Sequence, residues 1–272
     1  MARAPKRATA IIPARLASTR FPRKALADDT GKPMVVHVCE QAAKAERVER
    51  VVVATDAEEI AEAVRAHGFE AVMTGEHDNG TSRIAEAAET LELKKSSVVV
   101  NVQGDEPEID PELIEAAIST FSVQLNSSWE LGDQPHHEQE KYASVGTVAC
   151  PFEPGESPDD PNIVKAVVGV IEPVAGVAPG LYFSRAPIPF DRDGGGSPAF
   201  LKHLGIYAYH VRDLFGFLGL PPTPLEQTEK LEQLRWLEHG LTIAVAIRRT
   251  AHHGIDTPEQ YAAFVERHRS RS

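Results

Sequence analysis

The sequence predicts an α/β protein with a mostly parallel sheet. Short apolar runs rich in valine and isoleucine alternate with segments of helical length, which is the pattern of βαβ units. These runs are apolar throughout, as expected for parallel strands buried on both faces. Turns with charged and polar side chains follow three of these runs, at residues 15–24, 55–56 and 103–106. Ligands of parallel sheets bind beyond the carboxyl ends of the strands, so the three turns predict a site at that edge.

The first half of the chain supplies the regular alternation. Pro33 suits the first position of a helix, because its φ is fixed and it has no N–H to satisfy. Gly68 is a typical helix stop. Strands are expected at residues 9–12, 51–54, 70–73 and 97–102, and helices at 34–45, 58–67, 80–91 and 111–125.

The second half alternates less regularly. Residues 126–141 are polar and without periodicity, so the adjacent His136 and His137 favour a surface insertion over a metal site. Residues 181–192 combine strand character with proline-rich turns. Further strands are expected at residues 142–150, 163–171, 202–207 and 241–247, and helices at 225–239 and from Thr257 onward.

Composition narrows the class of function. The 272 residues carry a formal net charge of -12, and the sequence pI is near 5.4. This argues against nucleic-acid binding, which needs a broad basic face, and is compatible with a small anionic ligand. Cys39 and Cys150 are predicted to be reduced core residues. No apolar run is long enough for a signal peptide or a membrane span, so no membrane partner and a cytoplasmic location are expected.

Positive charge gathers locally in residues 10–24, which read AIIPARLASTRFPRK. An apolar strand turns at Pro13 into a loop of small residues that carries four cations and no acidic residue. Backbone N–H groups and cations in such a turn are suited to hold a phosphate. The alternative from this segment alone is a solvated loop with scattered surface arginines.

Eight motifs, taken together and in order, resemble those of one enzyme family. They are PARLASTRFPRKAL, ATD, HDNGTSR, NVQGDEP, YFSRAPIPFDRD, KHLGIYAY, PLEQTEKLEQLR and GIDTPE. In this they are closely similar to the 3-deoxy-D-manno-octulosonate (KDO) cytidylyltransferases, over about residues 9–268. The resemblance implies a Rossmann-like nucleotidyltransferase sheet in a single domain, residues 1–272. It also implies an embedded substrate and dimerisation arm at about 151–205, and a homodimer.

The resemblance also implies the reaction. Members of the family transfer CMP from CTP to the 3-deoxy sugar acid KDO, release pyrophosphate, require Mg²⁺ and serve lipopolysaccharide biosynthesis. The anomeric hydroxyl is expected to attack the α-phosphate in line. Mg²⁺ and Lys24 would stabilise charge on that phosphate, and Arg15 and Arg20 would stabilise the leaving pyrophosphate.

Site residues follow by matching motif positions. The catalytic set is Lys24, Arg15, Asp105 and Asp256, of which the two aspartates are the Mg²⁺ ligands. The nucleotide is assigned to Ala14, Arg15, Ser18, Thr19, Arg20, Lys24, Thr55, Asp56 and Gln103. The sugar acid is assigned to Arg83, Gln103, Arg192, His203, Tyr207, Glu232 and Gln233.

Read individually, several of these residues have ordinary structural interpretations. Arg83 suits a helix surface, and Tyr207 a strand core. Glu232 and Gln233 would usually face water on an amphipathic helix. Asp256 precedes Thr257, Pro258 and Gln260, which fit an N-cap, a first helical position and a capping box.

The chain also departs from the family pattern. Arg23 stands where a glycine is usual, so it either adds a phosphate contact or restricts the loop backbone. Ser82 replaces a carboxylate beside Arg83, and Phe190 replaces a tryptophan. Alternatives therefore stay open: a cytidylyltransferase for sialic acid or the 8-amino form of KDO, or a non-catalytic nucleotide-binding module.

Overall fold

The chain folds into two compact units, each described here by itself. The computed structural model describes residues 7–18, 20–123, 143–172, 175–192, 200–250 and 254–271. Of these, the first unit holds the residues up to 115 together with 210–215 and 254–271. The second unit holds those from 116 to 209 and from 216 to 250. Residues 126–141, expected to be a surface insertion, lie outside the described residues.

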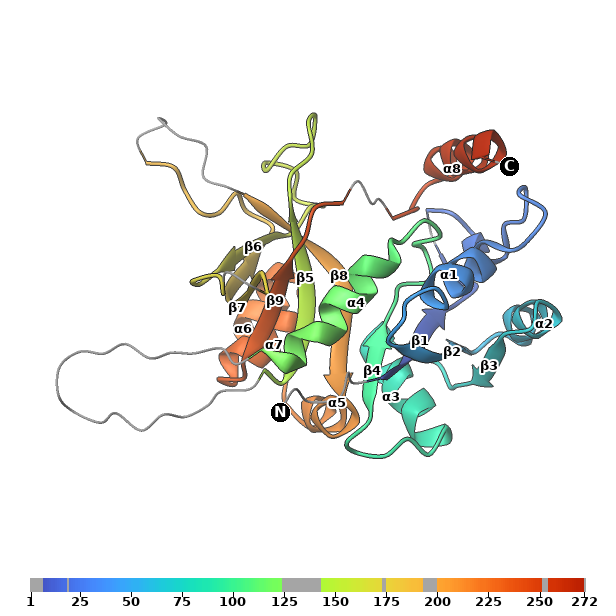
Figure 1. Cartoon of the computed structure of the whole chain (residues 1–272), viewed down its shortest axis with the longest axis horizontal. Coiled ribbons are helices and arrows are strands. Elements are labelled where there is room, and N and C mark those ends of the chain that lie inside the picture. The colour runs from blue at the N-terminus through green and yellow to red at the C-terminus, as the bar shows by residue number, and fades with distance from the viewer. Residues whose placement is uncertain are drawn as a thin grey trace. The chain divides into compact units, whose positions relative to one another are not determined.

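The first unit is built on four parallel strands (Figure 1). Their order is β3-β2-β1-β4, so β1 pairs with β2 on one side and with β4 on the other. Each coincides with a strand expected from the apolar runs, so the parallel sheet is confirmed. The strands are β1 (Ala8–Ala14), β2 (Val48–Thr55), β3 (Glu70–Met73) and β4 (Val98–Asn101).

Helices cover this sheet and make its core. Ile11, Ile12, Val53 and Val99 are wholly buried, and burial of each such side chain contributes about 1.5–3 kcal/mol. The short η1 (Lys24–Leu26) follows the basic loop. The helices are α1 (Met34–Ala42), α2 (Glu58–Ala66), α3 (Gly80–Thr90), α4 (Pro111–Ser119, extended by η2, Thr120–Ser122), α5 (Val211–Leu218) and α8 (Pro258–Arg271). The chain passes from one unit to the other within α4 and again within α5.

The second unit has a mixed sheet in the order β8-β5-β9-β7-β6. Only the β5–β9 pair is parallel among its described neighbouring pairs; β5–β8, β7–β9 and β6–β7 are antiparallel. The elements are β5 (Val145–Pro151), β6 (Lys165–Val168), β7 (Val177–Ser184), β8 (Leu201–His210), β9 (Ile243–Ile247), α6 (Pro224–Glu229) and α7 (Gln233–Glu238).

The single helix expected at residues 225–239 is wrong. Lys230 adopts a left-handed conformation with φ 55°, which ends α6 before α7 begins. The cause is tertiary: the carboxylate of Glu229 accepts hydrogen bonds from Ser184 Oγ at 2.6 Å and from the Arg185 backbone at 3.0 Å. These contacts with β7 outweigh helical periodicity.

Glu226 of α6 does not face the solvent. Its side chain is buried and accepts a hydrogen bond from Arg235 Nε at 2.7 Å. The Arg235 guanidinium also lies 4.6 Å from the centre of the Phe217 ring. A buried carboxylate is tolerated here because its charge is paired and hydrogen-bonded.

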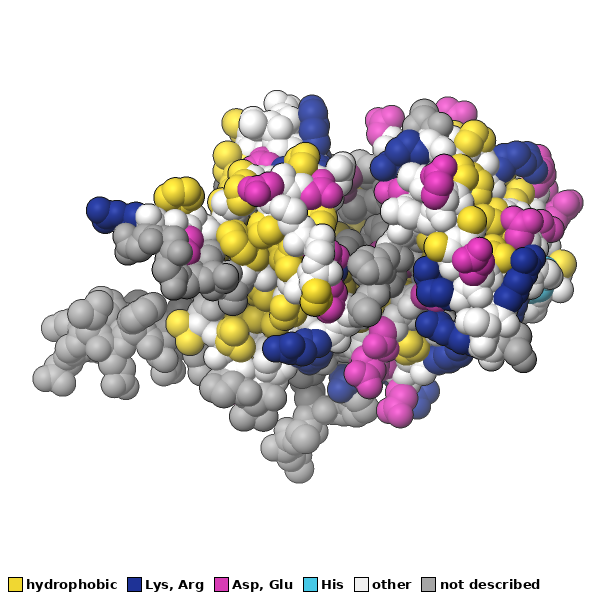
Figure 2. All heavy atoms as spheres, turned by 90° about the horizontal axis from the view of Figure 1, so that it is seen from above, with side chains coloured by type: hydrophobic (Ala, Val, Ile, Leu, Met, Phe, Trp, Pro, Cys, Tyr) yellow, Lys and Arg dark blue, Asp and Glu magenta, His cyan; other side chains and the backbone are white. Residues whose placement is uncertain are grey.

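Surface charge is mixed in sign. On the face shown in Figure 2, the Lys and Arg side chains of the described residues are interspersed with Asp and Glu and form no continuous basic patch. The folded chain thus presents no broad basic face there of the kind that nucleic-acid binding needs. Among the helices that the structure describes, none combines the length and the apolar character needed to cross a bilayer.

Candidate functional site

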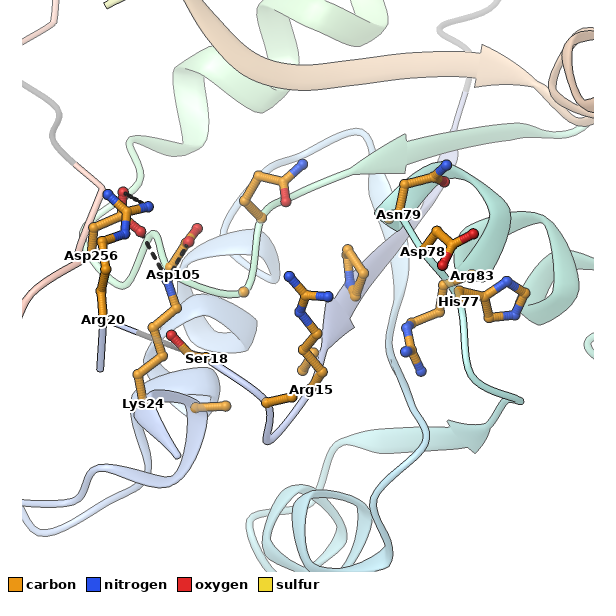
Figure 3. Close-up of a pocket in the computed structure, with 17 residues that line it drawn as sticks. Arg15, Ser18, Arg20, Lys24, His77, Asp78, Asn79, Arg83, Asp105 and Asp256 are labelled. Carbon is orange, nitrogen blue, oxygen red and sulfur yellow. Dashed lines mark hydrogen bonds and ion pairs between the residues drawn. The ribbon is translucent and has the colours of Figure 1, made fainter. Parts of the chain in front are cut away.

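A pocket of about 660 Å³ lies in the first unit, at the carboxyl ends of β1 and β4 (Figure 3). It therefore lies where the turns that follow the apolar strands predicted a site. The lining comes from the loop after β1, the start of α3, the turn after β4 and one residue ahead of α8. It consists of Pro13, Ala14, Arg15, Ala17, Ser18, Arg20, Lys24, Ala25, His77, Asp78, Asn79, Gly80, Arg83, Gln103, Gly104, Asp105 and Asp256.

The basic loop after β1 forms one wall. Arg15, Ser18 and Arg20, all predicted from the motif, line the pocket. Thr19 lies outside the described residues. The turn after β4 comes very close to the end of β1, since a Cβ on Gly104 would lie 2.8 Å from the Pro13 carbonyl oxygen. Only glycine allows that approach, so Gly104 is what lets the two turns form one wall.

Lys24 lies between the two predicted metal ligands. Its Nζ donates to Asp105 Oδ2 at 2.7 Å and to Asp256 Oδ1 at 3.1 Å, and also to the Ile255 carbonyl at 3.1 Å. Arg20 Nη2 pairs with the other Asp256 oxygen, Oδ2, at 3.0 Å. The Lys24 side chain is only 17% exposed, against 31% for Asp105 and 44% for Asp256. Two cations thus balance two carboxylates in a partly open cluster.

The start of α8 places Asp256. Gln260 Oε1 accepts hydrogen bonds from the backbones of Asp256 at 2.7 Å and Thr257 at 3.1 Å, and the Gln260 backbone donates to Thr257 Oγ1 at 3.3 Å. The capping box expected from the sequence is confirmed. The Ile255 backbone also donates to the Asp105 carbonyl at 2.8 Å. The helix-start interpretation and the closeness of Asp256 to Asp105 are therefore both correct.

The body of α8 is held by its own small core. Tyr261, Phe264 and Val265 pack with Met34 of α1 and with Ile255. The Tyr261 hydroxyl accepts a hydrogen bond from the Asp29 backbone at 2.9 Å. Because these contacts fix the axis of α8, they also fix where Asp256 enters the pocket.

The donor set at this cluster suits a hard cation. Among the described residues, nowhere do three or more His, Cys, Asp or Glu side chains gather as a metal site would require. Asp105, Asp256 and the Ile255 carbonyl offer oxygen ligands only. Mg²⁺ is commonly held by one or two carboxylates, with phosphate oxygens and water completing its shell. The residues present therefore fit Mg²⁺ brought together with a nucleotide.

The opposite wall of the pocket is organised by Arg83 of α3. Its side chain is 4% exposed and pairs with Asp56 Oδ2 at 2.8 Å. It also donates to Thr74 Oγ1 at 2.7 Å and to the Gly75 carbonyl at 3.3 Å. The interpretation as a surface cation is wrong, because Arg83 links α3 to the chain that follows β2 and β3.

The remaining residues assigned to the nucleotide divide into two groups. Ala14 and Gln103 line the pocket, whereas Thr55 and Asp56 are not among its lining residues. Thr55 is wholly buried, and its hydroxyl accepts a hydrogen bond from the Ala57 backbone at 3.2 Å. Asp56 is tied to Arg83, which does reach the pocket.

Sequence reasoning missed His77, Asp78 and Asn79, which line the pocket just before α3. His77 contacts Ser82 Oγ at 3.0 Å and the Glu86 carboxylate. The bond from His77 holds the pKa of Glu86 below its usual value. Asn79 Oδ1 caps α3 by accepting from the Ser82 backbone at 2.9 Å. An asparagine directly before a helical run is a typical N-cap, so the sequence could have predicted that residues 77–79 lead into α3.

Arg23 does not line the pocket. Its φ of 58° is left-handed, the region that favours glycine, and its guanidinium pairs with Glu59 of α2. The departure from the family's usual glycine thus keeps the glycine-like backbone and directs the extra charge to a neighbouring helix. Of the two readings of Arg23, the added phosphate contact has no support among these contacts.

His203 and Tyr207 lie on one face of β8, in the second unit. Thr147 Oγ1 lies 2.8 Å from the Ile206 carbonyl and 2.9 Å from His203 Nε2. Since the hydroxyl has one proton and gives it to the carbonyl, Nε2 carries the proton of His203 and Nδ1 is left as an acceptor. Burial lowers the pKa of His203 to about 3 and raises that of Tyr207, so both are neutral.

The other residues assigned to the sugar acid differ in exposure. Gln233 is buried, and its Nε2 has no hydrogen-bond partner among the described residues. An unpaired buried donor is costly unless a ligand completes it. Its expected exposure on a helix face is wrong. Glu232 precedes α7, and Arg192 is exposed.

Comparison with known proteins gives the family. The cytidylyltransferase family matches residues 9–243. A 3-deoxy-manno-octulosonate cytidylyltransferase of Syntrophobacter fumaroxidans is 46% identical over 261 residues, 95% of this chain and 96% of the relative. One of the same name from Wolinella succinogenes is 45% identical over 252 residues, 92% of this chain and 94% of the relative.

Solved structures agree. A CMP:2-keto-3-deoxy-manno-octonic acid synthetase complexed with CTP matches with a TM-score of 0.83 at 34% identity, covering 98% of this chain and 100% of that one. A 4-diphosphocytidyl-2C-methyl-D-erythritol synthase, 13% identical with a TM-score of 0.58, covers 96% of this chain and 99% of its own, and shares the fold. The chain belongs to the cytidylyltransferase family, among the 3-deoxy-manno-octulosonate cytidylyltransferases.

Proposed function

We propose that this protein transfers CMP from CTP to KDO, forming CMP-KDO and pyrophosphate for lipopolysaccharide biosynthesis. The observation that carries the proposal is the cluster of Lys24, Asp105 and Asp256 at the strand ends, next to a loop lined by Arg15 and Arg20. Relatives that match 92–95% of this chain are named for that reaction. The complex with CTP supports CTP as the nucleotide.

The basic loop is proposed to bind the triphosphate. Arg15 and Arg20 supply positive charge, and the small residues between them leave backbone N–H groups accessible to phosphate oxygens. As the bond between the α-phosphate and pyrophosphate breaks, negative charge grows on the leaving group. Preorganised cations stabilise that charge without reorganisation.

Lys24 is proposed to stabilise the α-phosphate during attack by the anomeric hydroxyl of the sugar acid. Its ammonium is already held at the cluster, and the side chain is mostly shielded from water. Asp105 and Asp256 are proposed to hold Mg²⁺. When bound, the ion supplies charge stabilisation to the phosphate oxygens.

The sugar acid is proposed to contact residues of the second unit. The neutral His203 offers Nδ1 as an acceptor for a sugar hydroxyl, and Gln233 offers an amide donor that no described residue engages. Tyr207 and Glu232 add further polar groups. Arg192 and Arg83 are the assigned cations, and a guanidinium fork suits a carboxylate. Arg83 has three of its N–H groups taken by Asp56, Thr74 and the Gly75 carbonyl, so Arg192 is the better candidate for this role.

We further propose a homodimer formed through an arm at about residues 151–205 within a single functional domain. Exposed apolar side chains support it: Val170 is 81% exposed and Phe190 84%, with Ile171 and Leu181 also exposed. All four fall within the proposed arm, where exposed apolar side chains are suited to a protein–protein contact. Ultracentrifugation should find a dimer that Phe190→Asp with Val170→Asp weakens; an unchanged sedimentation coefficient would argue against this arm.

The reaction is tested by pyrophosphate release. Purified protein with CTP and Mg²⁺ should release pyrophosphate with KDO and not without a sugar acid. Sialic acid and 8-amino-KDO, offered separately, decide between related substrates. ATP, GTP and UTP should support little release with KDO. Absence of release with every sugar acid would favour the non-catalytic module.

A further inference from the structure

We propose that Lys24 is the resident counter-ion of the two-aspartate site and keeps metal affinity low until a nucleotide draws its ammonium away. This inference rests on the proposed function, because it assigns Asp105 and Asp256 to Mg²⁺. It adds that metal and nucleotide bind cooperatively and that one side chain couples them. The two carboxylates are then never left facing each other without a cation.

The geometry of the ammonium is the first observation. An ammonium has three N–H donors and no acceptor. The three acceptors around Lys24 Nζ are Asp105 Oδ2, Asp256 Oδ1 and the Ile255 carbonyl, at 2.7, 3.1 and 3.1 Å. Every donor is therefore engaged. Lys24 cannot donate to a phosphate oxygen until it releases at least one of these three partners.

The second observation is that the oxygens Lys24 holds are those a metal needs. Asp105 and Asp256 come from segments far apart in sequence, and the ammonium is the one group that contacts both in the part of the chain the structure describes. A divalent cation at the same oxygens would lie within a few ångströms of Nζ. Like charges at that distance repel, and the repulsion is poorly screened where water is partly excluded.

A bound triphosphate would give the Lys24 ammonium alternative acceptors. Lys24 lies on the same pocket wall as Arg15, Ser18 and Arg20, which are the proposed triphosphate ligands. A bound triphosphate offers Nζ new anionic acceptors while the metal takes over the carboxylates. The two carboxylates keep a cationic partner in both arrangements, because the metal replaces the ammonium at the aspartates. By linkage, whatever the nucleotide adds to metal affinity, the metal adds equally to nucleotide affinity.

The test is metal binding in the absence of nucleotide. Mn²⁺ serves as the probe, and electron paramagnetic resonance counts the free ion during titration of the full-length protein. Lys24→Met removes the ammonium and keeps a flexible side chain of similar length, so Mn²⁺ affinity should rise about tenfold or more. Lys24→Arg retains the charge and should bind Mn²⁺ as weakly as the unmodified protein does.

Two further variants separate the ammonium from general effects. Arg23→Ala removes a neighbouring cation whose partner is Glu59, so it should leave Mn²⁺ affinity unchanged. Asp105→Asn in the Lys24→Met background should abolish the gain, which shows that the freed carboxylates bind the ion. Thermal unfolding checks each fold, and Lys24→Gln carries the same expectation should Lys24→Met not fold.

The inference is overturned if Lys24→Met or Lys24→Gln binds Mn²⁺ no more tightly than the unmodified protein, or if Lys24→Arg or Arg23→Ala gains as much. Failure of the proposed function looks different. It is an unmodified protein that releases no pyrophosphate from CTP with any sugar acid, whatever the Mn²⁺ titrations show.

Discussion

The two walls of the pocket use the same kinds of residue for different ends. At one wall Lys24 and Arg20 meet Asp105 and Asp256, whose side chains are 31% and 44% exposed. At the other, Arg83 meets Asp56, and their side chains are 4% and 26% exposed. A partly open pair can exchange partners for a ligand, whereas a closed pair must stay intact to avoid leaving a buried charge. Burial therefore separates the reactive charges from the structural ones.

The largest expected effect is on turnover at the open wall. Asp256→Asn should lower kcat about 10²–10⁴-fold, since several kcal/mol of metal-supplied charge stabilisation depend on that carboxylate. The free energy of unfolding should change little, because Asn retains the shape and the backbone contact with Gln260. Steady-state kinetics and urea unfolding measure the two.

The double variant sharpens this expectation. Asp105→Asn combined with Asp256→Asn should cost far less than the product of the two single effects, because both side chains are proposed to hold one ion. Additive effects, or an active Asp256→Asn enzyme with normal Mg²⁺ dependence, would remove Asp256 from the site.

At the wall formed by Arg83 and Asp56, a substitution should mainly lower the free energy of unfolding. Arg83→Met leaves Asp56 without its guanidinium partner and removes the bond to Thr74. Because Asp56 keeps some access to water, the loss is expected at about 2–3 kcal/mol, below that of a fully buried pair. Arg65→Met is the matched control on α2, since Arg65 pairs with Glu58 at the surface and should cost at most about 0.5 kcal/mol. Equal losses for the two variants in urea unfolding would erase the distinction between the walls.

The free energy of unfolding should depend on pH through His37, which packs under α8, the helix that places Asp256 in the pocket. His37 is buried under α8, beside Phe264 and His268. Burial first, then the charges of Lys32 and His268, lower its pKa to about 4. The unfolded chain binds a proton at His37 near pH 6.5, whereas the folded chain binds it only near pH 4. Stability is therefore fully present above pH 6.5 and falls as pH drops toward 4, by up to about 1.4 kcal/mol per pH unit.

A variant isolates that contribution. His37→Gln retains a donor for Thr30 and removes the titration, so the slope of unfolding free energy between pH 6.5 and 4 should decrease by about one proton. Urea unfolding at several pH values measures it. An unchanged slope would assign the acid sensitivity to other groups, such as His203 of the second unit, whose pKa is also lowered.

The smallest effect is expected at Arg23. Arg23→Ala loses a solvent-exposed ion pair with Glu59 and keeps the left-handed φ, so its free energy of unfolding should change little. Arg23→Gly loses the same pair but relieves the backbone, so it should be more stable than Arg23→Ala by about 1 kcal/mol. Both should keep normal turnover. Loss of activity in Arg23→Ala with full stability would place Arg23 at the phosphates after all.

The sequence predicted the first unit well and the second less well, for physical reasons. Fully buried parallel strands are apolar throughout, and that pattern is local. The break at Lys230 was invisible because it depends on Glu229 reaching β7, a contact distant in sequence. Arg83 and Gln233 were misjudged alike, since helical periodicity indicates a face without showing what covers it. His77 was missed because its partners Ser82 and Glu86 become neighbours only once α3 forms.

The proposed site residues come from motifs rather than from periodicity. Lys24, Asp105 and Asp256 stand in three turns whose sequences are distinctive, and the structure brings all three together. The engagement of every Lys24 donor could not be read from sequence, since it depends on the Ile255 carbonyl as much as on the two aspartates.

The position of Asp256 just before α8 has a consequence for biosynthesis of the protein. Lys24 and Asp105 leave the ribosome early, but Asp256 is made 151 residues after Asp105 (256 minus 105), a delay of roughly 8–30 s at about 5–20 residues per second. During that interval the nascent chain has the basic loop and the sheet beneath it without the second carboxylate. The proposed two-aspartate metal site is therefore incomplete until the α8 segment has emerged and docked.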